Sequence, residues 1–148
     1  MSFLSSMNIS ASAMTAQRLR LDVASENIAN IDTTRTEAGG PYQRKIVVLE
    51  SRNENNFRRI MMNAAGISRQ QSTGGVRVSQ IVQDTSPYKS VYNPDHPDAD
   101  ENGYVQMPNV DLLKETVDSM SAYRSYEANI TAFNAIKMMA SKALEIGK

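Results

Sequence analysis

Residues 110–146 read VDLLKETVDSMSAYRSYEANITAFNAIKMMASKALEI and contain neither Gly nor Pro, the residues that most disfavour a helix interior. Apolar side chains recur in this stretch at helical spacings, Asn109 or Asp111 can cap its start, and Gly147 suits its end. A helix of roughly 36 residues spans about 55 Å. A compact chain of 148 residues is under about 40 Å wide. We therefore expect this helix to need a partner helix, from the N-terminus of its own chain or from another subunit.

A second, weaker helical pattern lies at the N-terminus. Met7, Met14, Leu21 and Ile28 recur every seven residues in a segment, 1–31, that also lacks Gly and Pro. Ala and Ser occupy most remaining positions, so neighbouring backbones could approach closely. The apolar content of each turn is small, and such a helix is marginal alone in water.

The middle of the chain has a different character. Residues 32–109 hold all five prolines and six of the seven glycines. Strands are predicted at 44–50, 75–82 and 103–107, while 57–62 fits either a strand or a short helix. The predicted fold is α+β in three parts: an N-terminal helix (1–31), a small β-rich domain with loops (32–109) and a long C-terminal helix (110–148). The two terminal helices are expected to pair as a coiled coil.

Composition excludes several classes of function. Sixteen basic and sixteen acidic residues argue against bulk nucleic acid or an anionic membrane as partner. The absence of cysteine excludes disulfides, thiol nucleophiles and zinc–thiolate sites. We expect no membrane-spanning segment, because no apolar run approaches the ~18 residues required, and no cleavable signal peptide.

Charge is nevertheless uneven along the middle part. Residues 52–77 hold five Arg and one acid, whereas 78–111 hold one Lys and six acids. Opposed patches on a neutral chain suit head-to-tail packing against copies or relatives. An ordinary solvated surface is the alternative.

The segment Asp98-Ala99-Asp100-Glu101-Asn102-Gly103 matches the opening of a calcium-binding loop. The match fails at the twelfth position, where Asn109 replaces the bidentate Glu, and an acidic turn between two strands is the favoured interpretation. A calcium-responsive binding module stays as the alternative function. His96, the single histidine, could act as a base with Asp95 or Asp98 in a small hydrolase, but no nucleophile can be named. We expect no catalytic residues, cofactor or metal.

Two motifs resemble a known family. Residues 21–34, LDVASENIANIDTT, are similar to the N-terminal signature of bacterial flagellar rod, hook and hook-associated axial proteins. Ser125-Tyr126-Glu127-Ala128-Asn129 resembles their C-terminal signature. Residues 34–45, and residues 93–105 followed by 107–110, are similar to the proximal rod branch of that family. The pair Ile31-Asp32 departs from the usual pattern, in which Asn or Ala precedes Asn.

The resemblance implies a structural subunit of the basal-body rod, the drive shaft that crosses the periplasm and transmits motor torque. It also implies passage through the flagellar type III export apparatus without a cleaved signal. The implied partners are other copies of the chain, the rod proteins FlgB, FlgF and FlgG, and the adaptor FliE. A distal rod or hook subunit is the nearest rival within the family.

The residues expected to carry assembly are apolar positions of the two helices together with three asparagines, Asn27, Asn30 and Asn129, which are candidates for interhelical hydrogen bonds. We also expect both terminal helices to be largely disordered in the free subunit and to order on assembly. A buried charge introduced by Ile130→Asp should block assembly. The predicted interface is Met7, Met14, Leu21, Asn27, Ile28, Asn30, Ile31, Leu113, Val117, Met120, Tyr123, Tyr126, Asn129, Ile130 and Phe133.

Overall fold

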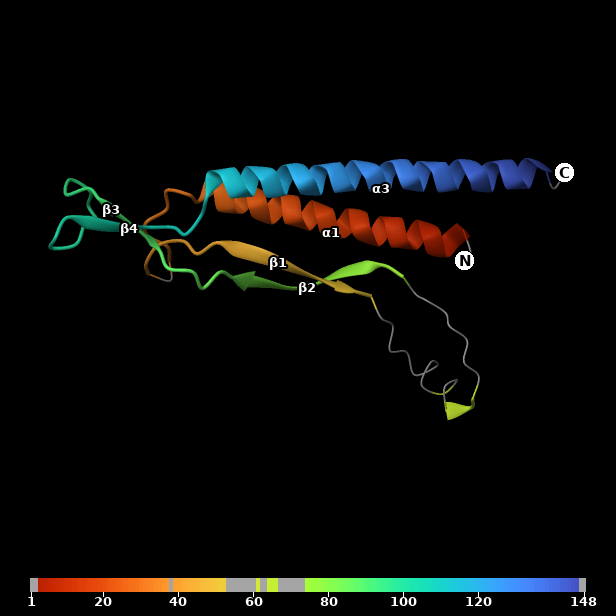
Figure 1. The fold of residues 1–148 in the computed structure, drawn as a ribbon, viewed down its shortest axis with the longest axis horizontal. Coiled ribbons are helices and arrows are strands. Elements are labelled where there is room, and N and C mark those ends of the chain that lie inside the picture. Colours follow the sequence, from red (N-terminus) through yellow and green to blue (C-terminus); the bar gives the residue numbers. More distant parts are fainter. Residues whose placement is uncertain (1–2, 38, 53–60, 62–63, 67–73, 147–148) are drawn as a thin grey trace.

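The computed structural model describes residues 3–37, 39–52, 61, 64–66 and 74–146. Its elements are α1 (Phe3–Ala29), β1 (Lys45–Ser51), β2 (Val76–Gln83), β3 (Lys89–Tyr92), β4 (Tyr104–Met107) and α3 (Leu112–Ile146). Figure 1 shows an elongated molecule in which α1 and α3 lie side by side and both termini lie at one end. The hairpin β1–β2 runs along α1, and β3–β4 projects at the other end. The predicted α+β class, with terminal helices around a β-containing insert, is confirmed.

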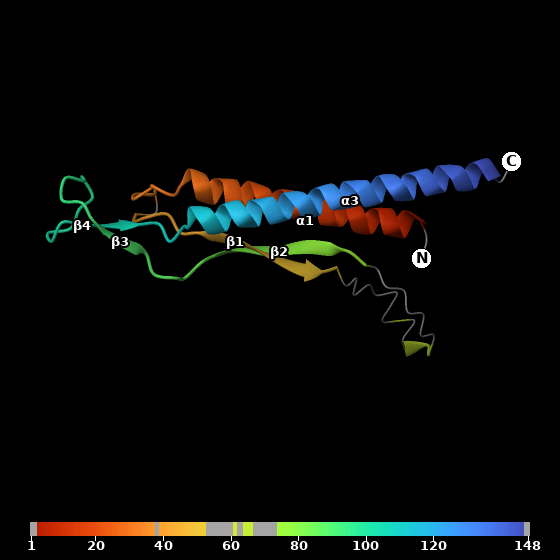
Figure 2. The same cartoon turned by 45° about the horizontal axis from the view of Figure 1, so that its top comes forward.

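The long C-terminal helix is confirmed as α3. Its 35 residues span about 52 Å at ~1.5 Å per residue. Asp111 caps the helix, because its Oδ1 accepts the backbone N–H of Leu113 at 3.0 Å. Asn109, the other capping candidate, binds backbone groups of the insert instead. The partner of α3 is α1 of the same chain, as the turned view in Figure 2 also shows.

Helix α1 is the middle layer of the molecule, since it contacts α3 on one side and both β1 and β2 on another. Small side chains make this close packing possible. The most buried positions of α1 include Ser10, Ala16 and Ala24, with only Val23 as a larger apolar residue. The apolar core is accordingly thin, which agrees with the low hydrophobic content of the N-terminal pattern.

The insert forms two separate antiparallel hairpins. In the first, β1 pairs with β2 from Lys45↔Gln83 to Ser51↔Val76, with an irregularity between Val48 and Leu49. In the second, β3 pairs with β4 from Lys89↔Met107 to Tyr92↔Tyr104. The strands predicted at 44–50, 75–82 and 103–107 are therefore confirmed. The segment 57–62 lies outside the described residues apart from Met61, which has helical geometry.

Strand β3 was missed by the sequence prediction. Its four residues, Lys89–Tyr92, are too short for an alternating pattern to stand out. What makes them a strand is the partner β4, reached through the turn 93–103. Tertiary pairing thus decides this element.

The hairpin β1–β2 meets the N-terminal half of α1 at Gly75. The backbone N–H of Val76 donates to Ser12 Oγ at 3.1 Å. Gly75 has φ +142°, and a Cβ there would lie 2.8 Å from Ser12 Oγ. Glycine is required at this position both by its backbone conformation and by the close approach of the hairpin to α1.

Candidate functional site: a polar junction and the helix face it orients

The two helices meet along a heptad stripe on α3. Apart from Ser125, the buried and half-buried positions of α3 recur in alternating steps of four and three residues, which is the spacing of one helix face. Because α1 is the helix that α3 contacts, this stripe faces α1. Its members are Glu115, Ser119, Ala122, Tyr126, Asn129, Phe133, Ile136 and Ala140.

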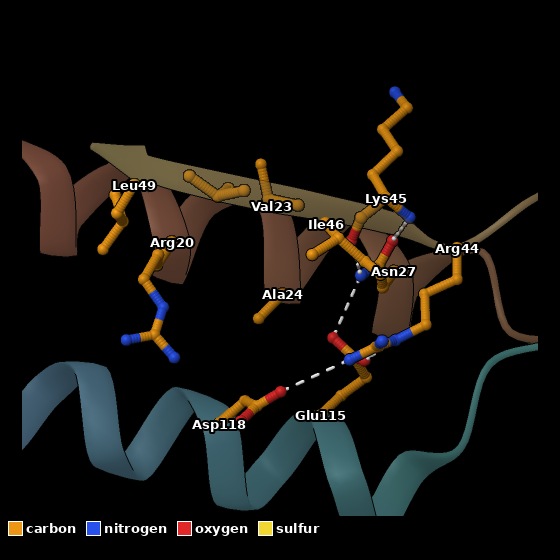
Figure 3. A pocket seen from close by; sticks show the side chains of 11 residues that line it. Arg20, Val23, Ala24, Asn27, Arg44, Lys45, Ile46, Leu49, Glu115 and Asp118 are labelled. Carbon is orange, nitrogen blue, oxygen red and sulfur yellow. Dashed lines mark hydrogen bonds and ion pairs between the residues drawn. The ribbon is translucent and has the colours of Figure 1, made fainter. Parts of the chain in front are cut away.

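Asn27 occupies the centre of a junction between α1, β1 and α3 (Figure 3). Its Oδ1 accepts the backbone N–H of Lys45 and the hydroxyl of Tyr42, each at 2.9 Å. Its Nδ2 donates to the backbone carbonyl of Lys45 at 2.9 Å and to Glu115 Oε2 at 3.0 Å. An amide side chain offers two donors and two acceptor sites. All four are used, on a side chain that is 1% exposed.

Glu115 is the buried charge of the junction, and Arg44 neutralises it. Arg44 Nε lies 2.5 Å from Glu115 Oε1, while its other nitrogens lie 3.3 Å from Asp118 Oδ2 and 3.6 Å from Asp84 Oδ2. Burial alone would lower the pKa of Arg44. The hydrogen bond and charge of Glu115, followed by Asp118 and Asp84, outweigh that effect and raise its pKa. The guanidinium of Arg44 thus pairs with three carboxylates, of which that of Glu115 is the buried one.

Two further side chains complete the junction. Burial, followed by the negative charges of Glu26 and Glu115, raises the pKa of Tyr42 to about 12, so its hydroxyl stays a donor to Asn27. Asn109 Oδ1 accepts the backbone N–H of Arg44 at 2.8 Å. Through its Nδ2, Asn109 also binds the carbonyl of Asp84 at 3.0 Å.

A cleft of about 300 Å³ opens beside the junction, between α1, β1 and the first turns of α3 (Figure 3). Val23 and Ala24 form its apolar base, and Arg20 points into it from α1. Within the described part of the chain, every buried side-chain nitrogen and oxygen has a hydrogen-bond partner. The polar groups of the junction hold α1, β1 and α3 together. A buried polar network stabilises such a contact only when all of its hydrogen bonds are made, as they are here.

The acidic loop is joined to the segment after α1. Thr34 Oγ1 donates to Asp98 Oδ2 at 2.8 Å, and Arg35 lies 4.0 Å from Asp98. His96 Nδ1 accepts the backbone N–H of Asp98 at 3.1 Å, so the histidine shapes the loop. Across the described residues, no three His, Cys, Asp or Glu side chains gather as metal ligands would. The two stretches that resemble the proximal rod branch therefore meet in space.

The predicted assembly residues fall into groups with different surroundings. On α3, Leu113 (74% exposed), Val117 (58%) and Met120 (55%) lie on the face turned away from α1, with Tyr123 beside them. Ile130, at 36% exposure, lies at the border of that face. The three other α3 residues of the predicted set belong to the stripe that faces α1, namely Tyr126, Asn129 and Phe133.

The N-terminal members of the set are covered to different degrees. Met7, Met14, Leu21 and Ile28 of α1 are half-buried within the single chain, as is Ile31 in the turn that follows α1. Asn27 makes an interhelical bond to Glu115, as described above.

Two predicted asparagines bond to nearby groups of their own segments, Asn30 in the turn that follows α1 and Asn129 within α3. Asn30 donates to the carbonyl of Glu26, and Asn129 to the carbonyl of Ser125. Arg44, Tyr42 and Glu115 were not identified from the sequence. The signal available was that Glu115 is the one charged side chain on the stripe of α3 that faces α1.

Comparison with known proteins matches both ends of the chain. The family model described as flagella basal body rod protein matches residues 7–35, and the one described as flagellar basal body rod FlgEFG protein C-terminal matches residues 101–146. The flagellar basal-body rod protein FlgC of Bacillus subtilis is 53% identical over 150 residues, covering 97% of each chain. The chain belongs to the FlgC family of flagellar basal-body rod proteins. The Borreliella burgdorferi protein of the same name is 44% identical over 99% of this chain and 98% of its own, and that of Salmonella typhimurium 43% over the whole of both.

Membership in this family makes the chain a structural subunit of the rod in the flagellar basal body, where it assembles with other rod and basal-body components. The relatives share one name over nearly their whole length, which favours this branch over a distal rod or hook subunit. None of the described helices has the length and hydropathy needed to cross a membrane. The polar junction and the exposed face of α3 are accordingly features of an assembly protein.

Proposed function

We propose that this rod subunit packs into the axial structure through the face of α3 turned away from α1. The observation that carries the proposal is that α3 has two apolar faces and α1 covers only one of them. Leu113, Val117, Met120 and Tyr123 stay more than half exposed on the other face. Large apolar side chains gathered on one exposed helix face are typical of a protein contact.

The polar junction supports the mechanical part of the proposal. A drive shaft must pass torque from its helical core to the segments outside it without letting them swing. Asn27 and Arg44 bind α1, β1 and α3 to one another through directional bonds, which resist a change of angle better than apolar contacts do. We infer that the junction fixes the angle between the helix pair and the β hairpins.

The neighbours implied by the family are the rod proteins FlgB, FlgF and FlgG, the adaptor FliE and further copies of this chain. Delivery through the flagellar type III export apparatus to the periplasmic rod, without a cleaved signal, belongs to the same proposal. We expect no catalytic step.

An in-frame deletion strain tests the general role. We expect loss of swimming and, in electron micrographs, loss of the rod and of everything distal to it while the membrane ring remains. Intact rods in that strain would refute the structural role.

Substitutions on α3 test the proposed surface. Val117→Asp and Ile130→Asp should abolish swimming while the subunit is still exported, because assembly would bury an unpaired charge. Ser25→Asp, on the exposed polar side of α1, is the matched control and should swim normally. Normal rods in the Val117→Asp strain would show that this face is not the contact.

A further inference from the structure

Two loops far apart in the sequence form the tip of the molecule opposite the termini. The segments 32–40 and 93–103 are held together by the bond from Thr34 to Asp98 and by the pairing of Arg35 with Asp98. They carry six carboxylates and one arginine, a net charge of −5 with His96 neutral. The carboxylates are those of Asp32, Glu37, Asp95, Asp98, Asp100 and Glu101.

Beside this acidic rim lies an uncovered face of the β3–β4 hairpin. Tyr92 and Tyr104, which pair across the hairpin, are 65% and 46% exposed, and their rings pack edge to face with centroids 5.3 Å apart. A Cβ at Gly103 would lie 2.9 Å from the ring of Tyr92, so glycine makes this ring packing possible. An aromatic centre with a charged rim has the composition of a protein interface.

The opposite charge is carried by the segment that joins β1 to β2. Residues 52–77 contain five arginines and one acid, a net charge of +4 in a chain whose total formal charge is zero. The chain leaves β1 at Ser51 and enters β2 at Val76, beside Ser12 in the N-terminal half of α1. Figure 1 shows this end of the hairpin remote from the β3–β4 tip. The acidic tip and the point where the arginine-rich segment is attached are thus well separated within one copy.

We propose that the β3–β4 face formed by Tyr92 and Tyr104, with its acidic rim, docks the arginine-rich segment 52–77 of a second copy, head to tail. Arginine suits this surface because its planar guanidinium both stacks on aromatic rings and pairs with carboxylates. A contact between two different surfaces of identical subunits does not close on itself unless the rotation closes, and it otherwise continues as a helical array. The inference rests on the proposed role as an assembling rod subunit and names one of its contacts.

Charge reversal at the tip tests the contact. Asp100 and Glu101 make no side-chain hydrogen bond or ion pair within the described residues, so D100K/E101K removes no internal bond. Like charges brought together at an interface cost several kcal/mol. We therefore expect roughly tenfold or more fewer complete rods per cell. The neutral variant D100N/E101Q is the control for loop folding and should have a milder effect. Adding R58E/R59E to the reversed chain should restore rods.

Cross-linking identifies the occupant. The chain has no cysteine, so N102C at the tip and S51C at the end of β1 are unique thiols. Basal bodies from cells expressing both variants, treated with a bismaleimide, should yield a species of twice the chain mass. N102C expressed alone, or with S25C on α1, should not yield it.

Three results would overturn the proposal: normal rods in the D100K/E101K strain, a neutral variant as damaging as the reversed one, or linkage of N102C to a protein other than this chain. Each leaves the structural role of the chain standing. That role fails only if the deletion strain keeps its rods.

Discussion

Asn27 and Glu115 lie 88 residues apart in the chain and are joined by a hydrogen bond of 3.0 Å from Nδ2 to Oε2. The same amide binds the backbone N–H and carbonyl of Lys45. The side chain of Asn27 thus links the last turns of α1 to the first turn of α3 and to the start of β1. We expect these three elements to unfold together.

Asn27→Ala should lower the free energy of unfolding by about 2–4 kcal/mol, because four bonds are lost and buried partners are left unpaired. Asn27→Asp keeps the shape but presents an acceptor to Glu115 and to the Lys45 carbonyl, so it should destabilise at least as much at neutral pH. Urea denaturation followed by circular dichroism measures both. Asn30→Ala, which breaks only local bonds within residues 26–33, is the control, and a larger loss there than at Asn27 would contradict the role of the junction.

Stability should fall in alkaline solution through Tyr42. Its pKa is raised from 10.0 to about 12 in the folded chain, so its stabilising contribution is fully present below pH 10 and is lost as the pH rises towards 12. The loss is up to about 3 kcal/mol.

Tyr42→Phe provides the matched comparison. It should be less stable than the wild type at pH 8, because Asn27 Oδ1 loses one donor, but its stability should fall less steeply between pH 10 and 11.5. Urea midpoints measured at half-unit steps give both curves. Parallel curves for the two proteins would show that Tyr42 is not the titrating group.

Gly75→Ala should destabilise the chain by about 1–3 kcal/mol, because the new Cβ would meet Ser12 Oγ at 2.8 Å and the backbone has φ +142°. Gly40→Ala isolates the backbone effect, since φ there is +94° and nothing lies within 4 Å of a Cβ. We expect the smaller loss at Gly40. Thermal unfolding of the two variants compares their stabilities directly. Equal losses of stability would show that the close contact between the new Cβ and Ser12 adds nothing to the backbone effect.

Amide exchange in the isolated subunit should follow a gradient along the helix pair. Protection should be strongest near the junction, at residues 20–29 of α1 and 112–122 of α3, where the polar network adds to burial. It should decline towards Phe3 and Ile146. This refines the expectation that the helices order only on assembly. Hydrogen–deuterium exchange by mass spectrometry, with and without assembly into basal bodies, measures it, and uniform protection in the free subunit would contradict both versions.

Much of the fold could be predicted because it depends on local sequence. The absence of Gly and Pro marked both terminal helices, and the alternation at Val76-Arg77-Val78 marked β2. The predicted assembly surface combines residues from two different faces of α3. Periodicity identifies apolar positions on a helix, but α3 has two apolar faces, and the sequence alone does not say which of them α1 covers. Phe133 and Val117 thus entered one predicted set although they lie on different faces.

The junction was harder to foresee for a physical reason. The role of Asn27 depends on its reach to Lys45, Tyr42 and Glu115, which only the tertiary fold brings together. An asparagine in a helical pattern indicates an interhelical bond but does not name the partner. Arg44 appeared merely as the first residue of a strand, and its three carboxylates come from two other segments.

The amide of Asn27 has one more effect, on the edge of the β1–β2 hairpin. The backbone N–H and carbonyl of Lys45 point away from β2, and Asn27 binds both as a neighbouring strand would. Asn109 binds the N–H of Arg44 on the other side of the strand, where the carbonyl of Arg44 accepts the N–H of Asp84. Free strand edges recruit foreign strands and begin aggregation. The carboxamide of Asn27 therefore closes the start of this edge and leaves no free backbone group at Lys45 for a foreign strand to pair with.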